Sequence, residues 1–385
     1  MKVSLVCVED ALMNMGFRKL AGYVNKGLSY ETDIYYVTLG GNFYSYWTML
    51  FGKGGEAPEC NEDGLRRRAE PVADADVVAF SCMTPYAETT RGLIRHVREI
   101  NPQAFVVWGG IHPIMNPEDA IESADGICTG EGEFSFEEFL SKYENGEDFT
   151  DTKNFWFNLD DEIIRNPHRP LMTSEEMGQL PLLQYGEDEK IYSDRQQQYR
   201  RLSPRIYRKF NSLAYNTVWS IGCPLHCTFC GNTKFIDNHS DYTQVRHSPP
   251  SYIVDEIERG LEIHPYVSTV QFHDDSFMAL HPDTLREFAE EYKSRIDLPF
   301  HVAGVIPNYV TEERMEILLD AGMHRLRMGI QNGSEEILEF YKRPAPPERV
   351  REAAETIQKY RGYMIPPAYD VIVDNPVETE ETVRE

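Results

Sequence analysis

Long hydrophobic runs are missing from the 385-residue sequence. A membrane-spanning helix needs about 20 consecutive, mostly apolar residues, and the chain has no such run. Its first residues, MKVSLVCVEDALMN, also lack the basic region and the long apolar stretch of a secretory signal peptide. We therefore expect a cytoplasmic protein without a membrane partner.

Basic residues are scarce relative to acidic ones. Lys and Arg number 38, Asp and Glu number 63, and the formal net charge is −25. Such a surface repels the phosphate backbone of nucleic acids, so no nucleic acid is expected as the main partner. The length suits two domains with a connecting segment rather than one ordinary core.

Cysteine is infrequent and unevenly placed. The seven cysteines are Cys7, Cys60, Cys82, Cys128, Cys223, Cys227 and Cys230. An odd number, with three close together, does not indicate a disulfide framework. It is typical of a reducing compartment and of one set of metal ligands. Cys7, Cys82 and Cys128 are expected to be small buried side chains.

Residues 1–145 alternate short apolar runs with helical patterns. Strands are predicted over Val3–Val8, Asp33–Leu39 (ending at Gly40-Gly41), Val77–Ser81, Phe105–Trp108 and Gly126–Thr129. This alternation predicts a parallel sheet with helices on both faces. Ligands of such sheets bind beyond the carboxyl ends of the strands, where the loops of this segment would meet.

The periodicity fades over residues 146–211, which predicts a linker with a small hairpin near Phe155–Ile164. The last part of this stretch, Tyr199–Phe210, is basic and aromatic. We expect a solvated connecting helix there, with contact to an anionic ligand as the alternative.

Residues 212–385 alternate strands and helices again. Strands are predicted over Ala214–Trp219, Thr269–Phe272, Phe300–Val305, Leu326–Ile330 and Ala368–Val373. This pattern predicts a barrel-like sheet with an active site at the carboxyl ends of its strands. A complete core of this type needs at least one more strand, so we expect a truncated C-terminal end or another element that closes the sheet.

Cys223, Cys227 and Cys230 stand in the spacing C-x3-C-x2-C, directly after the first strand of the second domain. A [4Fe–4S] cluster usually takes four thiolates, and three leave one iron open to another ligand. Structural zinc, which takes four ligands, is the alternative, with His226 inside the loop. The spacing differs from a two-plus-two zinc pattern and no second C-x2-C pair follows, so the cluster is favoured.

With Phe229 before its last cysteine, this motif resembles the radical S-adenosylmethionine (SAM) superfamily. Gln271–Phe277 resembles a second-strand segment of the B12-associated members. Met328–Glu335 resembles their fourth-strand motif, usually G-I-E-S-G-S, and Tyr369–Glu380 resembles a fifth-strand segment that usually reads G-x-P-G-E-T. Two departures are Gln331 in place of the usual Glu and Asp374-Asn375 in place of a Gly-containing turn.

The resemblance implies a mechanism. SAM would bind the open iron of a cluster held by the three cysteines, and the reduced cluster would release a 5′-deoxyadenosyl radical that takes a hydrogen atom from the substrate. The implied SAM contacts are Phe229, Gly231, Asp274, Asp275, Arg327, Gln331, Asn332 and Ser334. For Arg327 the alternative is a structural ion pair, and for the two aspartates it is helix capping or a salt bridge.

Upstream, the segments Phe105–Pro113, Pro117–Ala120 and Thr129–Glu133 resemble the cobalamin-binding domain of the B12-dependent radical SAM class. Glycines there would let the backbone approach the nucleotide tail of the cofactor. The implied cobalamin contacts are Met13, Gly16, Ser81, Met83, Thr84, Gly109, Gly110, His112, Pro113, Gly130, Glu131, Gly132 and Glu133.

Many cobalamin domains supply a lower-axial histidine from D-x-H-x-x-G after the first strand. Here the first histidine is His96, and Met13 stands at the histidine position if Gly16 is the motif glycine. The sequence therefore predicts cobalamin bound without a histidine ligand from this loop. His112 is expected as a tail contact or turn residue rather than as a cobalt ligand.

The resemblance covers nearly the whole chain and implies an α/β fold. A Rossmann-like (flavodoxin-like) cobalamin-binding domain over 1–145 would precede a linker over 146–211 and a partial (β/α)6 TIM-like radical SAM barrel over 212–385. The leading function is a cobalamin-dependent radical SAM methyltransferase, acting on an unactivated carbon of a small-molecule substrate and reduced by a flavodoxin- or ferredoxin-type donor.

Three alternatives remain. The first is a B12-dependent radical SAM cyclase or oxidative rearrangement enzyme. The second is an RNA methylthiotransferase, although Cys7, Cys60, Cys82 and Cys128 form no evident cluster-binding set in the first domain. The third is a non-catalytic cobalamin- or cluster-binding sensor.

Overall fold

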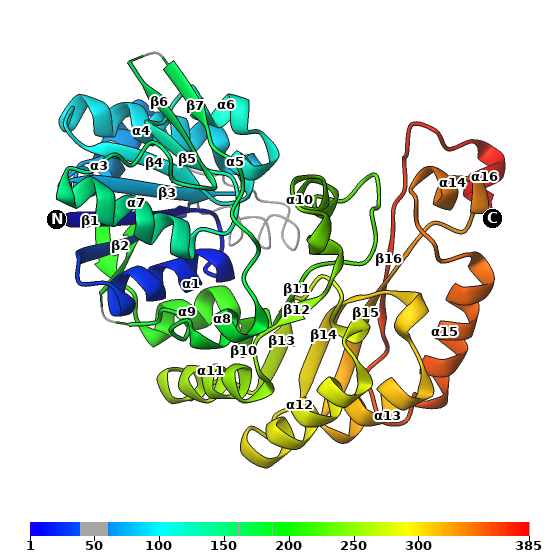
Figure 1. Cartoon of the computed structure of the whole chain (residues 1–385). Helices are drawn as coiled ribbons and strands as arrows, with labels where there is room; N and C mark the ends of the chain where they lie inside the picture. Colours follow the sequence, from blue (N-terminus) through cyan, green and yellow to red (C-terminus); the bar gives the residue numbers. More distant parts are fainter. Residues whose placement is uncertain (39–60, 161, 187, 385) are drawn as a thin grey trace. The chain divides into compact units, whose positions relative to one another are not determined.

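The computed structural model describes residues 1–38, 61–160, 162–186 and 188–384. The chain forms two compact units, which are shown in Figure 1. One consists of Met1–Pro170 with Leu180–Phe210, and the other of Leu171–Gln179 with Asn211–Glu385. Three features named from the sequence lie outside the described residues: the end of the second predicted strand at Leu39, the Gly40-Gly41 pair after it, and Cys60.

The first unit contains a parallel sheet built from the five predicted strands. They are β1 (Lys2–Val8), β2 (Glu31–Val37), β3 (Val77–Cys82), β4 (Phe105–Gly109) and β5 (Gly126–Cys128), and their order is β5-β4-β3-β1-β2. This is the order of flavodoxin-like sheets. Because helices cover both faces, the strands are continuous apolar runs, and every residue of β3 is buried.

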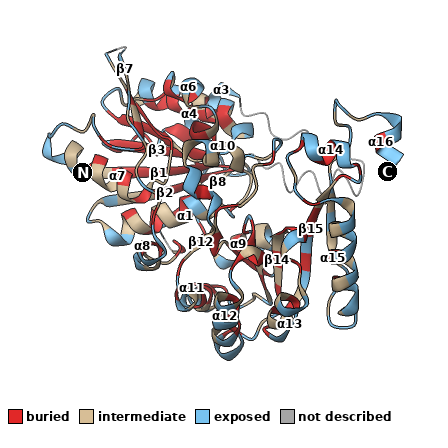
Figure 2. Cartoon of the chain, turned by 45° about the vertical axis from the view of Figure 1, so that its right-hand side comes forward, coloured by how far each residue is buried: buried red, intermediate tan, exposed pale blue. Residues whose placement is uncertain are grey.

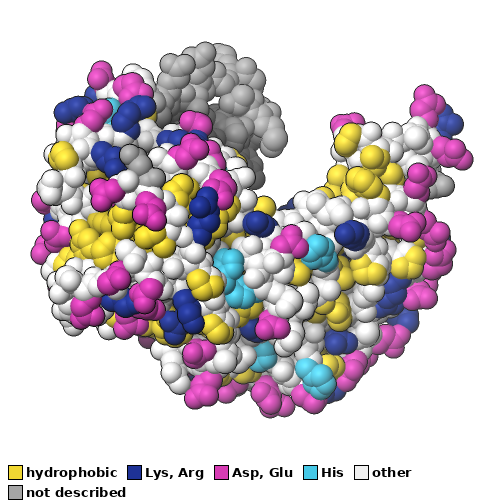
Figure 3. Space-filling view, turned by 45° about the horizontal axis from the view of Figure 1, so that its top comes forward, with side chains coloured by type: hydrophobic (Ala, Val, Ile, Leu, Met, Phe, Trp, Pro, Cys, Tyr) yellow, Lys and Arg dark blue, Asp and Glu magenta, His cyan; other side chains and the backbone are white. Residues whose placement is uncertain are grey.

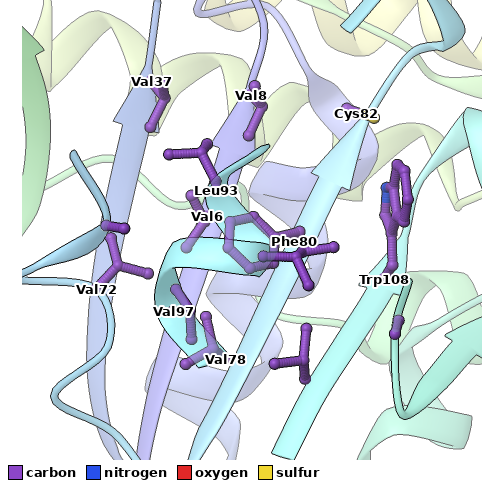
Figure 4. Packing of buried hydrophobic residues seen from close by; sticks show 14 of the residues in the cluster. Val6, Val8, Val37, Val72, Val78, Phe80, Cys82, Leu93, Val97 and Trp108 are labelled. Atoms are coloured by element: carbon purple, nitrogen blue, oxygen red, sulfur yellow. The ribbon is translucent and has the colours of Figure 1, made fainter. Parts of the chain in front are cut away.

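The helices of the first unit pack on these two faces. They are α1 (Met15–Gly22), α3 (Glu62–Ala69), α4 (Ala87–Ile100), α5 (Ile111–Met115), α6 (Pro117–Ile121) and α7 (Glu133–Asn145). The core on the side of α4 joins Val6 and Phe80 of the sheet to Leu93 and Val97 of that helix, with Trp108 beside them (Figure 4).

The stretch from 146 to 211 differs from the expected linker. The hairpin predicted near Phe155–Ile164 is present as β6 (Phe155–Leu159) and β7 (Glu162–Arg165), and it extends the first sheet beyond β5. A second hairpin, β8 (Glu189–Ser193) and β9 (Gln198–Arg201), extends the sheet beyond β2. Edge strands such as β9 are largely exposed and polar, so their apolar periodicity is weak.

Two short helices complete this part of the chain. The basic segment Tyr199–Phe210 is not the single solvated helix that we expected: its first residues lie in β9, and Pro204–Asn211 forms α9, which buries Tyr207. The helix α8 (Ser174–Gln179) belongs to the second unit. A buried ion pair of 2.7 Å between Arg18 Nη1 and Glu189 Oε1 fastens β8 to α1, so these residues are part of the domain rather than a tether.

The second unit contains a parallel sheet of five strands in chain order. They are β10 (Ala214–Thr217), β13 (Thr269–Phe272), β14 (Phe300–Val305), β15 (Met323–Gln331) and β16 (Ala368–Val371). After β10 the chain turns into β11 (Ser220–Ile221), which pairs antiparallel with β12 (Arg246–His247). The first predicted strand therefore ends two residues earlier than expected, at Thr217.

Helices follow these strands as a barrel-like sheet requires. They are α10 (Asn232–Asn238), α11 (Pro250–Ile263), α12 (Pro282–Arg295), α13 (Glu312–Asp320), α14 (Glu335–Phe340), α15 (Pro347–Lys359) and α16 (Glu380–Arg384). Phe272 and Phe300 pack on Phe288 and Tyr292 of α12 and form an aromatic core. Figure 2 shows the buried strands and the exposed outer faces of the helices.

No helix among the described residues is both long and apolar enough to cross a lipid bilayer. Acidic side chains are distributed over the visible surface of both units, as Figure 3 shows.

Candidate cluster site and cofactor-binding edge

The cysteine loop begins just beyond β11, after the carboxyl end of the first strand of the second sheet. Gly222 has a φ of +115°, and a Cβ at this position would lie 2.5 Å from the carbonyl oxygen of Gln244. The next residue is tied to the same segment, since Cys223 N donates to Tyr242 O at 3.1 Å. Only glycine permits this backbone approach, which fixes where the loop starts.

The three cysteines of the motif are buried or half-buried in this loop. Cys223 and Cys227 are buried, with 7% and 4% of their surface exposed, and Cys230 is half-buried. Cys230 N donates to Cys227 O at 3.0 Å, and Thr233 Oγ1 donates to the same oxygen at 2.6 Å. Burial raises the pKa of the Cys223 thiol to about 11. A bound metal centre would act in the opposite direction, because its positive charge favours the thiolate.

The donor set suits a multi-iron cluster. Three cysteines lie within eight residues of one loop, and cysteine thiolates are the ligands that iron–sulfur clusters take. His226 points to a different partner, with its Nε2 2.9 Å from Asp237 Oδ1.

Asp274 fastens the backbone that leads into the loop. Its Oδ1 accepts from Trp219 N at 3.1 Å, and its Oδ2 accepts from the backbone N and the Oγ of Ser220, both at 2.5 Å. Burial raises the pKa of this carboxyl to about 7, and the hydrogen bonds oppose that rise. The neighbouring Asp275 is exposed and accepts a hydrogen bond from Tyr242 Oη at 3.4 Å. Among the described residues Asp274 forms neither the helix cap nor the salt bridge named as alternatives to ligand binding, and its hydrogen bonds position the loop.

The turn after α14 docks on the cysteine loop, a contact that the sequence analysis missed. Thr228 N donates to Tyr341 O at 3.0 Å, and Thr228 Oγ1 donates to Phe340 O at 3.2 Å. The ring of Phe229, which is 41% exposed, meets Tyr341 edge to face with centroids 4.8 Å apart. No local motif signals these pairs, because their residues lie more than a hundred positions apart in the chain.

The other residues with implied SAM contacts lie on nearby elements of the second unit. Gly231 is exposed at the start of α10. Arg327 on β15 forms the structural ion pair named as its alternative, since its Nε donates to both oxygens of Asp370 at 2.8 Å. Gln331 ends β15 with a φ of +75°.

Asn332 and Ser334 connect β15 to α14. Asn332 is buried and donates from Nδ2 to Glu378 Oε1 at 2.7 Å, while its Oδ1 accepts from Ser334 N at 2.9 Å. Ser334 is buried at the N-cap position of α14. The side chain of Asn332 therefore joins this turn to the segment after β16.

In the first unit, the loop after β4 packs tightly on the end of β3. Gly110 has a φ of +87°, and a Cβ there would lie 2.7 Å from Ser81 Oγ and 2.9 Å from the backbone of Cys82. His112 is buried with both ring nitrogens engaged, since Nε2 lies 2.8 Å from Asp119 Oδ2 and Nδ1 lies 3.4 Å from Thr84 Oγ1. These contacts hold the His112 ring within the first unit, against Asp119 and Thr84.

The loop after β5 is organised by Asn154. Its Nδ2 donates to Glu131 O at 2.9 Å and to Ser135 Oγ at 3.1 Å. A Cβ on Gly130 would lie 2.7 Å from Asn154 Cγ, so the side chain of Asn154 covers this glycine. Glu133, at the start of α7, is buried, and this burial raises the pKa of its carboxyl to about 7.

The remaining residues with implied cobalamin contacts lie at the same edge of the first sheet. Met13, Gly16, Met83 and Thr84 are exposed, Gly109 and Gly132 are half-buried, and Pro113 is buried. The loop after β1 is held by Asn14, whose Nδ2 donates to Glu9 Oε1 at 2.7 Å and whose Oδ1 accepts from Phe17 N at 2.9 Å. The edge thus presents glycine backbone together with the exposed apolar side chains of Met13 and Met83, and a large cofactor could contact both.

Comparisons with known proteins agree with the division of the chain into two units. The B12 binding domain family matches residues 1–140, and the Radical SAM superfamily matches residues 217–385. An uncharacterised methyltransferase of Pyrococcus horikoshii is 22% identical over 318 residues, which cover 81% of this chain and 63% of that protein. The anaerobic magnesium-protoporphyrin IX monomethyl ester cyclase of Cereibacter sphaeroides is 26% identical over 322 residues, which cover 80% of this chain and 48% of that protein.

The solved structures show the same fold. The radical SAM methyltransferase TsrM from Kitasatospora setae, with cobalamin and a [4Fe–4S] cluster bound, superposes with a TM-score of 0.71 at 19% identity, covering 100% of this chain and 69% of that one. The chain spans about half to two thirds of the length of the two curated relatives. With both domains matched in this order, the chain belongs to the radical SAM proteins that carry an N-terminal B12-binding domain.

Proposed function

We propose that the chain acts as a cobalamin-dependent radical SAM enzyme that methylates an unactivated carbon of a small-molecule substrate. The observation that carries this proposal is the set of free cysteines in the loop beyond the carboxyl edge of the second sheet, in which Cys223 and Cys227 are buried and Cys230 is half-buried. When bound, the cofactors would supply a 5′-deoxyadenosyl radical and a transferable methyl group.

The chain's own residues would bind and orient these groups. The three cysteines would hold a [4Fe–4S] cluster and leave one iron open for SAM. Asp274 would keep the cysteine loop in place through its bonds to Trp219 and Ser220. Phe229 and Gly231, on the same loop, would contact the SAM adenine.

In the first unit, the loops after β3, β4 and β5 would hold cobalamin. Gly110 keeps the loop after β4 against β3, and Asn154 fixes the loop that contains Gly130 and Glu133. The engaged ring of His112 supports cobalamin binding without a ligand from this histidine. An electron must come from outside the chain, and we assign that role to a flavodoxin- or ferredoxin-type protein.

Anaerobic reconstitution with iron and sulfide, followed by SAM and dithionite, tests the radical chemistry. The wild type should release 5′-deoxyadenosine. Cys227→Ala should not, because two thiolates hold a cluster poorly. Release of equal amounts by the variant would contradict the cluster assignment, and no release by the loaded wild type would favour a non-catalytic sensor.

A cyclase or oxidative rearrangement enzyme is the second candidate. It is favoured by the 26% identity to a magnesium-protoporphyrin cyclase over 322 residues. SAM labelled in its methyl group separates the two activities once a substrate is found. A methyltransferase carries the label into product, whereas a cyclase releases 5′-deoxyadenosine with unlabelled product.

A further inference from the structure

Arg343 reaches the cysteine loop from the turn after α14. Its Nη1 lies 3.8 Å from Cys227 Sγ, within hydrogen-bonding distance for sulfur, and its Nη2 donates to Gly329 O on β15 at 3.0 Å. The two residues that this hydrogen bond to sulfur joins are 116 positions apart in the sequence. One guanidinium therefore ties a strand of the sheet to a cysteine of the motif.

The charge of Arg343 is not neutralised nearby. Within the described part of the chain, no carboxylate forms an ion pair with it, and its Nε has no hydrogen-bond partner. The side chain is half-buried, and a guanidinium stays protonated in proteins. A full positive charge thus lies beside Cys227 Sγ in a chain whose net charge is −25.

We propose that Arg343 is a positioning residue that donates a hydrogen bond to the Cys227 thiolate of the bound cluster and raises the reduction potential of that cluster. The inference rests on the proposed function, since it needs the cluster. Reduction adds one electron to an already anionic group. A hydrogen bond to its sulfur and a nearby positive charge both stabilise the reduced form more than the oxidised one.

The fork of the guanidinium suits this role better than an ammonium. Two of its N–H groups point in fixed directions, one toward Gly329 O and one toward Cys227 Sγ. Lysine would keep the charge and lose one of the two bonds. A graded series of Arg, Lys and Gln at this position therefore separates the charge from the geometry.

The test is an EPR-monitored redox titration of the reconstituted full chain, with iron content measured in the same samples. Arg343→Gln should keep its iron and shift the cluster to a more negative potential. We expect the ratio of reduced to oxidised cluster at a fixed potential to fall about tenfold, which is about 59 mV for one electron. The cluster potential of Arg343→Lys should lie between those of the wild type and Arg343→Gln. The matched control is Lys342→Gln, an exposed neighbour, which should leave the potential unchanged.

An unchanged potential in iron-loaded Arg343→Gln would overturn the proposal. If that variant loses its iron, Arg343→Lys decides, and a potential equal to that of the wild type then overturns it. Failure of the wild type itself to bind a cluster would instead contradict the proposed function, so the two failures are distinguishable.

Discussion

The carboxyl edges of the two parallel sheets carry different kinds of residue. At the edge of the first sheet, the named residues include glycines that permit close backbone contact, the exposed methionines Met13 and Met83, and the buried His112, which contacts Asp119 and Thr84. At the edge of the second sheet, three free cysteines lie buried or half-buried in one loop, and hydrogen bonds from neighbouring residues hold that loop in place. The first edge therefore offers backbone and apolar contacts, and the second offers the thiols that we propose as cluster ligands.

Both edges nevertheless bury carboxyl groups: Glu9 and Glu133 at the first edge, and Asp274 at the second. Glu133 in the first unit and Asp274 in the second each have a pKa raised to about 7 by burial. Asp274 uses its oxygens to hold Trp219 and Ser220, and Glu133 lies at the N-terminal end of α7. Asp274 thus serves the fold directly, because it fixes the backbone that leads into the cysteine loop.

The largest effect should follow from Gly110→Ala in the first unit. A Cβ there would meet Ser81 Oγ at 2.7 Å and the backbone of Cys82 at 2.9 Å, at a φ of +87°. The left-handed conformation and the overpacking together should lower the free energy of unfolding by about 3 to 5 kcal/mol. Urea unfolding followed by tryptophan fluorescence measures the loss.

Gly146→Ala is the matched control, since Gly146 has a φ of +67° and nothing within 4 Å of the added Cβ. Its cost should be only about 1 kcal/mol, because it adds the left-handed conformation without a clash. Equal costs at the two positions would contradict the claim that close packing defines the first edge.

A smaller change in the free energy of unfolding is expected from Glu133→Gln, and the size of this change depends on pH. The folded protein holds this proton up to a pKa of about 7, against an ordinary value of 4.5. Unfolding therefore releases the proton between these pH values, so the stability contributed by the neutral form is complete below 4.5 and falls as the pH rises through about 7. This loss amounts to at most about 3 kcal/mol.

Glutamine does not titrate, so Glu133→Gln should gain stability relative to the wild type between pH 5 and pH 8, measured as the difference in urea midpoints. Glu122→Gln, at an exposed position, is the control and should follow the wild type. If wild type and Glu133→Gln changed in parallel with pH, the buried carboxyl would not be the source of the dependence.

Thr228→Val should weaken the second edge by about 1 kcal/mol, the usual net value of one hydrogen bond. It removes the donor to Phe340 O and thus part of the contact that holds the cysteine loop. The rate of iron loss to a chelator should rise. Thr356→Val removes a comparable bond to Glu352 O on α15 and should leave iron retention unchanged. Equal rates in all three proteins would show that the turn after α14 does not support the cluster.

The smallest effect is expected for His112→Gln on the cobalt centre. Because both ring nitrogens of His112 already have partners, the EPR spectrum of bound cob(II)alamin should be the same in variant and wild type. Loss of a nitrogen splitting in the variant would identify His112 as a cobalt ligand and overturn the account of the first edge.

The sequence predicted the two parallel sheets because their central strands are buried apolar runs, as in Val77–Cys82. It did not predict that β8 and β9 belong to the first sheet. These edge strands mix charged and apolar residues, and tertiary contacts such as the Arg18–Glu189 pair place them. Local pattern carries no information about such pairs.

The candidate site also combines features that the sequence predicts with features that only the structure reveals. The cysteine spacing is local, so the motif was visible in the sequence. Tyr341 and Arg343 contact that loop only because of how the barrel-like sheet folds. No local sequence pattern predicts these contacts. The sequence placed Asp274 correctly at the carboxyl edge of the second sheet. Its hydrogen bonds to the backbone of Trp219 and Ser220 could only be seen in the structure.

The most direct test measures iron and cobalamin together in one reconstituted sample of the full chain. The account predicts that the wild type retains both, with iron matching one [4Fe–4S] cluster. Cys227→Ala should lose the iron and keep cobalamin, whereas His226→Ala, altered within the same loop, should keep both. A wild type that binds neither group, or a Cys227→Ala protein with undiminished iron, would contradict the assignment of the two edges.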